Sequence, residues 1–294
     1  MSNPRIPYRL SAETSALPLM NGKKLIVQAI MNIEAWRFDQ KMPRTIVTPP
    51  HGVEQIPDVP NFCWAEYGMR VGMDRLIKEF AARRIPVGAS INASVIDVYP
   101  ECAEAILKAD WEFIGHGLFQ KMIQGEADER SVIQATIDKI VRFTGTTPRG
   151  WLSPGLRESL DTPDHLVACG VDYTFDWILD DVPCFMQTSP KPLVALPYAS
   201  DLNDSIIYAI EHQATGEFAN RVARTLAVLE SEPGPKVISL GLHPHLMGVP
   251  HRMHEMRQIL DMLQNRSDTI FVKPAETMAW FNAATASAKM AQAS

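Results

Sequence analysis

The chain has 294 residues, of which 46% are hydrophobic and 21% charged, and its formal net charge is −6. This composition is typical of a globular protein and excludes disordered and fibrous classes. A chain of this length buries roughly three quarters of the surface that its unfolded form exposes, which is enough for a sizeable core. The acidic balance and the lack of a basic run argue against nucleic acid or an anionic membrane as a partner.

The N-terminus and the cysteines bear on location. The first twenty residues hold prolines and scattered polar groups rather than the apolar stretch of a signal peptide. No later segment has the ~20 apolar residues that a membrane span needs. Cys63, Cys102, Cys169 and Cys184 lack CxxC spacing, so neither a zinc knuckle nor a disulfide framework is indicated. We therefore expect a cytoplasmic protein with reduced thiols.

Short apolar runs alternate with helical patterns along the chain. An aperiodic, proline-containing N-terminal arm, residues 1–22, is expected to wrap the surface or a partner subunit. Residues 24–31 are almost continuously apolar and predict a buried strand, and residues 66–83 have helical spacing of apolar positions. Further strands are predicted at 85–91, 113–116, 150–152, 173–177, 193–196, 236–242 and 270–272, and further helices at 100–108, 127–143, 162–168, 215–231 and 254–264.

This alternation predicts a single α/β domain built on a parallel sheet, from residue 23 to residue 285, with a short tail at 286–294. The length favours a closed or nearly closed barrel over an open sheet. Neither GxGxxG nor GxxxxGK[ST] follows a predicted strand, which argues against dinucleotide and P-loop nucleotide binding.

Polar residues stand just after several predicted strands, where a parallel barrel collects its functional groups. Asn32 and Glu34 follow the first strand, His116 follows the run 113–115, and His243 and His245 follow the run 236–242. A carboxylate here can bind a metal or act as a base, and a histidine can donate a proton near neutral pH. Each residue alone could equally be a loop group bonded to the backbone. Their shared position favours a site.

Other strand ends carry candidates for substrate binding. Arg157 could hold a carbonyl or carboxylate through two hydrogen bonds, although a surface ion pair explains it equally well. Asp176 and Asp181 belong to a carboxylate cluster that cannot all stay ionised cheaply in a dry site, and capping of a helix is the alternative. The predicted substrate-binding residues are Trp151, Ser153, Arg157, Asp176, Trp177, Asp181 and His245.

Taken in order, these positions resemble the polysaccharide deacetylase superfamily, which has the NodB homology fold, over residues 24–281. That family has an Asp-x-Asp or Asp-Asp pair after its first strand, where this chain has Asn32-Ile33-Glu34. The family's His-x-x-x-His is represented by His116 with Gln120 in place of the second histidine, and its late Leu-x-His matches residues 240–243 loosely. The resemblance implies a single-domain deformed (β/α) barrel.

The departures from the family pattern direct the resemblance to one branch. Asn32 cannot act as a base, and Gln120 is a poor zinc ligand. The segments 32–36, 64–68, 176–183 and 243–252 look like the branch of metal-independent allantoinases and cyclic imide hydrolases. This resemblance implies a hydrolase of non-peptide carbon–nitrogen bonds that opens a small cyclic amide, imide or ureide. It also implies a homo-oligomer, because relatives in the branch form homotetramers.

The catalytic set on this reading is Glu34, His243 and Asn32. Glu34 and His116 could hold one divalent metal such as zinc, or no cofactor is required and Glu34 is the base, with His243 protonating the departing nitrogen. Two alternatives stay open. One is a metal-dependent N-deacetylase acting on a sugar or a small acetylated amine, and the other is a catalytically inactive barrel that binds a ligand.

Overall fold

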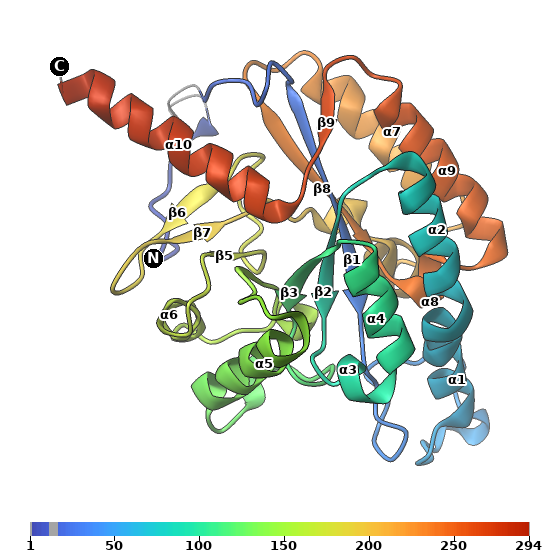
Figure 1. Cartoon of the computed structure of the whole chain (residues 1–294). Helices are drawn as coiled ribbons and strands as arrows, with labels where there is room; N and C mark the ends of the chain where they lie inside the picture. The colour runs from blue at the N-terminus through green and yellow to red at the C-terminus, as the bar shows by residue number, and fades with distance from the viewer. Residues whose placement is uncertain (1, 12–16, 294) are drawn as a thin grey trace.

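The structure is a computed structural model that describes residues 2–11 and 17–293 (Figure 1). Within these residues the strands form one nine-stranded sheet in the order β6-β7-β5-β4-β3-β2-β1-β8, and β9 pairs with β1. The strands are β1 (Leu25–Ile33), β2 (Val87–Ile91), β3 (Glu112–Gly115), β4 (Gly150–Trp151), β5 (Tyr173–Thr174), β6 (Cys184–Met186), β7 (Leu193–Ala195), β8 (Lys236–Leu242) and β9 (Thr269–Phe271). The α-helices are α1 (Val59–Tyr67), α2 (Met73–Arg83), α3 (Val95–Val98), α4 (Pro100–Lys108), α5 (Glu129–Thr144), α6 (Thr162–Ala168), α7 (Glu217–Leu229), α8 (Pro244–Met247), α9 (Pro250–Gln264) and α10 (Pro274–Ala293).

The sheet is a deformed (β/α) barrel, as expected from the sequence. Every strand pairing is parallel except that of β6 with β7. On its other side β8 has only isolated contacts in place of a continuous strand pairing. The Val237 amide donates to the Asp181 carbonyl at 2.8 Å, and Asn203 forms an isolated bridge with Gly241. All nine residues of β1 are buried, as a parallel strand covered on both faces requires.

Helices cover the outside of the barrel with their apolar faces. In Figure 1, α2, α7 and α9 lie together on one side of β1 and β8. Leu76 and Phe80 of α2 and Phe218 of α7 are fully buried in one cluster with the strand side chains. Burying a side chain of this kind stabilises the fold by about 1.5–3 kcal/mol, which is why the helical spacing in the sequence is informative.

The helical region before β2 begins earlier than predicted, at Val59 rather than residue 66, and Asp58 caps it by accepting from the Asn61 amide. Its middle, Gly68–Gly72, is a π-helix. A Cβ at Gly68 would lie 2.3 Å from the backbone nitrogen of His245. Glycine therefore lets this helix approach the short helix α8, which carries His245, as closely as the site needs.

The N-terminal arm and helix α10 both contact the region of β6, a strand that the sequence did not predict. The Gln187 amide donates to the Arg5 carbonyl at 2.8 Å, and Arg5 pairs with Asp164 at 2.7 Å. The described part of the arm therefore lies on its own chain; residues 1 and 12–16 lie outside the described residues. Helix α10 packs Phe281 against Phe185 at 4.8 Å and continues through residue 285, so the expected tail is helical up to residue 293. None of the helices in the described ranges is long and apolar enough to cross a membrane.

Candidate active site

The C-terminal ends of β1, β3 and β8 meet at one edge of the sheet because the strands between them pair in parallel. Glu34, His116 and His243 each follow closely on one of these ends, and the structure brings their side chains together. The Glu34 Oε1 atom lies 3.6 Å from His243 Nε2 and 4.0 Å from His116 Nε2. At most a tenth of each side chain is exposed to solvent, so their charges act on one another with little screening.

His243 is held by Asp204, which is fully buried just before a π-helix at Ser205–Ile210. The two Asp204 oxygens accept from the His243 backbone amide at 2.7 Å and from its Nδ1 at 2.6 Å. Burial alone would lower the pKa of His243, but the charges of Asp204 and Glu34 outweigh burial and raise it to about 10. His243 is therefore an imidazolium at neutral pH, with its Nε2 hydrogen on the Glu34 side. No pattern in the sequence pointed to Asp204.

Glu34 is an ionised carboxylate fixed by an indole. Its Oε2 atom accepts from the Trp36 Nε1 group at 2.8 Å, and the Ala35 amide next to it donates to Asn92 at 2.9 Å. Burial would raise the pKa of Glu34, but His243, and to a smaller extent the other nearby histidines, lowers it to about 2. Such a carboxylate is a strong hydrogen-bond acceptor and a poor proton acceptor at neutral pH.

His116 has the opposite character. Its Nδ1 atom lies 2.5 Å from the Leu152 carbonyl oxygen, which can only accept, so Nδ1 carries the hydrogen. Burial lowers the pKa of His116, so the ring is neutral and the lone pair lies on Nε2. That buried Nε2 has no hydrogen-bond partner in the described part of the chain. His116 Nε2 and Glu34 Oε1 are two acceptors 4.0 Å apart, a distance at which one water can donate a hydrogen bond to each.

A three-ligand metal site does not fit these residues. A catalytic zinc takes three protein ligands, and Glu34 and His116 supply two. His243 is bonded to Asp204 through Nδ1, while Gln120, whose Oε1 atom is buried without a partner, offers only an amide. Across residues 2–11 and 17–293 no three His, Cys, Asp or Glu side chains are arranged to hold a metal.

Two amides fix the hydroxyl of Tyr198. The Nδ2 groups of Asn32 and Asn203 lie 3.0 and 3.1 Å from it. Asn32 Nδ2 also reaches the Leu242 carbonyl at 3.2 Å, and Asn203 Oδ1 accepts from the Ser205 amide at 2.9 Å, so both amides are oriented as donors. The tyrosine oxygen thus accepts twice, and no described residue accepts its own hydrogen.

Glycine is required beside this hydroxyl. A Cβ at Gly241 would lie 2.8 Å from the Tyr198 oxygen and 2.7 Å from Asn203 Nδ2. Asn32, predicted from the sequence as a catalytic residue, lines the smaller hollow and donates to the Tyr198 hydroxyl. Neither Tyr198 nor Asn203 was predicted, since both follow β7 in an irregular segment.

Two adjoining hollows open over these groups and share part of their lining. The smaller hollow encloses about 150 Å³ and is lined by Asn32, His116 and Tyr198 among others. The larger hollow encloses about 410 Å³ and has His245 in its wall. Burial lowers the pKa of His245 to about 3, so its ring is neutral, and it lies edge-on to Trp64 at 4.6 Å. The residues common to both hollows are Glu34, Arg44, Gln120, Gly155, Ser205 and His243.

Several predicted substrate-binding residues support the site from beneath. Ser153 lines the smaller hollow, and its amide donates to Asp176 at 2.7 Å. Trp151 has no exposed surface and donates to the Ser153 hydroxyl at 2.9 Å. The prediction that Trp151 contacts the substrate is therefore wrong. Asp176 lies outside the lining of both hollows, as does Trp177, which donates to Glu158.

Two other predictions fail because of position. Arg157 is exposed and lines neither hollow, although Gly155 nearby does. Asp181 lies at the start of β8, where it pairs with Lys236 at 3.4 Å. His243 follows the other end of that strand, about 20 Å away at ~3.3 Å per residue.

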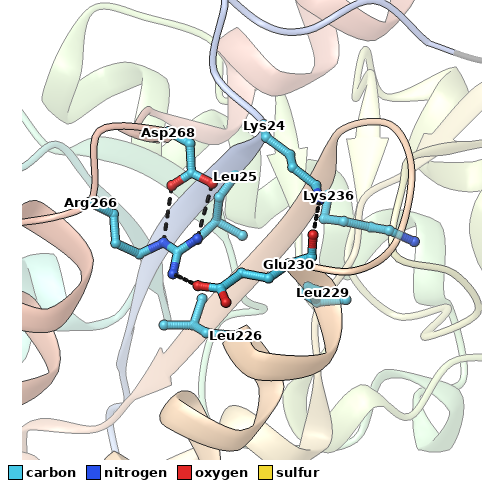
Figure 2. Close-up of a pocket in the computed structure, with 8 residues that line it drawn as sticks. All are labelled: Lys24, Leu25, Leu226, Leu229, Glu230, Lys236, Arg266 and Asp268. Carbon is cyan, nitrogen blue, oxygen red and sulfur yellow. Dashed lines mark hydrogen bonds and ion pairs between the residues drawn. The ribbon is translucent and has the colours of Figure 1, made fainter.

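A cluster of ion pairs and hydrogen bonds lies at the opposite end of β1 and β8. Figure 2 shows Arg266 between Glu230 and Asp268, with the Lys24 ammonium group donating to the Glu230 carbonyl at 2.8 Å. The hollow there encloses about 10 Å³, which holds at most about one water. These contacts join the start of β1 to the end of α7 and to the turn before β9, and their role is structural.

No family profile matches this chain, and no curated protein sequence does. Solved structures do match. A probable polysaccharide deacetylase from Pseudomonas aeruginosa PAO1 has 24% identity and a TM-score of 0.81, over 89% of this chain and 92% of that one. PuuE allantoinase has 22% identity and a TM-score of 0.81, over 96% of this chain and 95% of its own. This chain therefore has the deformed (β/α) barrel fold of the polysaccharide deacetylases, which its sequence resemblance implied and which PuuE allantoinase shares.

Proposed function

We propose that this protein is a hydrolase that opens a small cyclic amide, imide or ureide at a carbon–nitrogen bond. The observation that carries the proposal is the grouping of two acceptors and one acid around a single point. Glu34 Oε1 and His116 Nε2 are 4.0 Å apart, and the His243 imidazolium lies 3.6 Å from Glu34. A nucleophilic water and a proton donor are what hydrolysis of an amide needs. The similarity to the structure of an allantoinase supports this reaction class.

In the proposed reaction a water donates one hydrogen to Glu34 Oε1 and the other to His116 Nε2. Its oxygen attacks the ring carbonyl carbon while His116 takes the proton. The Tyr198 hydroxyl, whose hydrogen has no acceptor in the described chain, donates to the carbonyl oxygen as it becomes negative. This assignment moves the role of base from Glu34 to His116, because a carboxylate with a pKa of about 2 is a weak base.

The carbon–nitrogen bond then breaks. His243 Nε2 gives its proton to the ring nitrogen as the carbonyl re-forms, which leaves a carboxylic acid and a free amide nitrogen. The acid returns its proton to His243, and His116 releases the proton that it took from water. The net change is one water consumed and one carboxylate and one proton formed, so the enzyme ends in its starting state.

A substrate screen tests the proposal. Succinimide, glutarimide, hydantoin, dihydrouracil, allantoin and N-acetylglucosamine would each be incubated with the enzyme, with and without chelator, and product formation measured. We expect turnover of a cyclic compound, and a loss of about 10²–10⁴ in kcat for His116→Ala and for His243→Ala. His254→Ala, on the exposed face of α9, is the matched control. Release of acetate alone would favour the deacetylase, and binding without any turnover would favour an inactive barrel.

A further inference from the structure

We infer that Arg44 selects substrates that carry a carboxylate beside the ring; the inference rests on the proposed function and names its substrate class. Arg44 lies in the loop between β1 and α1 and lines both hollows of the site. Its side chain is half-buried, and among residues 2–11 and 17–293 it has neither an ion pair nor a hydrogen-bond partner. A guanidinium in this position offers a ready pair of parallel donors to a ligand.

The other cations around the larger hollow are already neutralised. Lys41 pairs with Glu54 at 2.9 Å, and Lys121 pairs with Glu126 at 2.9 Å. His243 is held between Asp204 and Glu34. Arg44 is thus the cation of the cavity for which the described chain supplies no anion. A ligand carboxylate supplies one, and its two oxygens match the guanidinium fork.

The shape of the cavity fits a ring with one anionic arm. The smaller hollow encloses about 150 Å³, which is room for a small ring. The larger hollow adds about 410 Å³ beside it. Arg44 lines both hollows. A ring bound in the smaller hollow, against Tyr198 and His116, therefore extends a substituent past Arg44 toward the larger hollow. Glu34, the carboxylate that lines the hollows, is engaged by Trp36 and His243, so it does not compete for Arg44.

Matched substrates test the inference. Dihydrouracil and dihydroorotate share a ring and differ by one carboxylate, and hydantoin and hydantoin-5-acetate share a ring and differ by one carboxymethyl group. We expect wild type to prefer the carboxylated member of a pair, and Arg44→Met to lower its kcat/KM by about 10² while the uncharged member keeps its rate. Arg44→Lys should recover part of the loss, since it keeps the charge but not the fork. Arg157→Met, which removes an exposed arginine outside the cavity, should change neither.

A binding measurement separates this inference from the proposed function. The ring-opened dicarboxylate N-carbamoylaspartate and the monocarboxylate N-carbamoyl-β-alanine would be titrated calorimetrically into wild type and Arg44→Met, with the thermal midpoint checked for each. Tighter binding of the dicarboxylate that Arg44→Met abolishes supports the inference even if no ring is hydrolysed. Hydrolysis of uncharged rings with equal losses on both members of a pair in Arg44→Met would overturn it and leave the proposed function standing.

Discussion

Replacing Asp204 by Asn tests the charge that holds His243. Asp204 and Glu34 raise the pKa of His243 from 6.5 to about 10 against the effect of burial. At ~1.4 kcal/mol for each tenfold change in proton affinity, this corresponds to about 5 kcal/mol of folding free energy shared between the two carboxylates. We expect Asp204→Asn to lower the free energy of unfolding by about 2–4 kcal/mol at neutral pH, close to the cost of opening a buried ion pair.

The pH dependence gives this prediction its sign. Because the folded pKa of His243 lies above the unfolded value, its stabilisation is complete below pH 6.5 and is lost as the pH rises through 10. Urea titrations from pH 6 to 10 should therefore show the wild type losing stability toward high pH and converging on Asp204→Asn. Asp201→Asn, exposed on the same segment, should follow the wild type. Parallel curves for wild type and Asp204→Asn would refute the ion pair.

Three further predictions concern the same edge of the sheet. Tyr198→Phe removes the free hydroxyl hydrogen and should lower kcat by about 10²–10³ with little change in KM, as measured by steady-state kinetics. Gly241→Ala places a methyl group 2.8 Å from that hydroxyl, so calorimetry should show a loss of about 1–3 kcal/mol of stability together with lower activity. Dialysis against chelator should leave turnover unchanged, because Glu34 and His116 lack a third ligand; activity restored only by zinc would contradict this.

The main residues of the site were predictable because they follow strands directly. Glu34, His116 and His243 lie within two residues of β1, β3 and β8, and parallel pairing brings those strand ends to one edge. Asp204 was not predictable, since eight residues without periodicity separate it from the end of β7. Arg44 was missed for the same reason, as it lies in a proline-rich loop whose path depends on tertiary contacts.

The strand-end rule also placed Asp181 wrongly, and the cause is the antiparallel strand β6. Asp181 follows β5 by only a few residues, so the rule put it at the site. The chain instead turns back toward the other end of the sheet before β6, and the Asp181 carbonyl accepts from Val237 at the start of β8. A short strand of reversed direction leaves little pattern in the sequence.

The cellular location and the oligomeric state of the protein stay predictions.

The buried groups form a line of alternating charge, which explains why Glu34 matters without being the base. Burial raises the pKa of Asp204, while the bonded His243 imidazolium lowers it and favours the carboxylate. With Asp204 ionised, the charges are negative, positive on His243, negative on Glu34 and zero on His116, with gaps of 2.6, 3.6 and 4.0 Å between neighbours. The negative charge of Glu34 raises the pKa of His116 against the effect of burial. When His116 takes a proton from water, the line becomes neutral overall, so the surroundings favour that step.

This line of charges makes a specific demand on Glu34→Gln, which keeps the shape of the side chain and removes its charge. Without the carboxylate, protonated His116 stands beside cationic His243 in a poorly screened site, and its proton affinity falls. We expect kcat to drop by about 10²–10⁴, because His116 then accepts the proton of the attacking water less readily. If Glu34→Gln kept its rate on a confirmed substrate while His116→Ala lost it, His116 would act without electrostatic support from Glu34, and the alternating line would have no part in the chemistry.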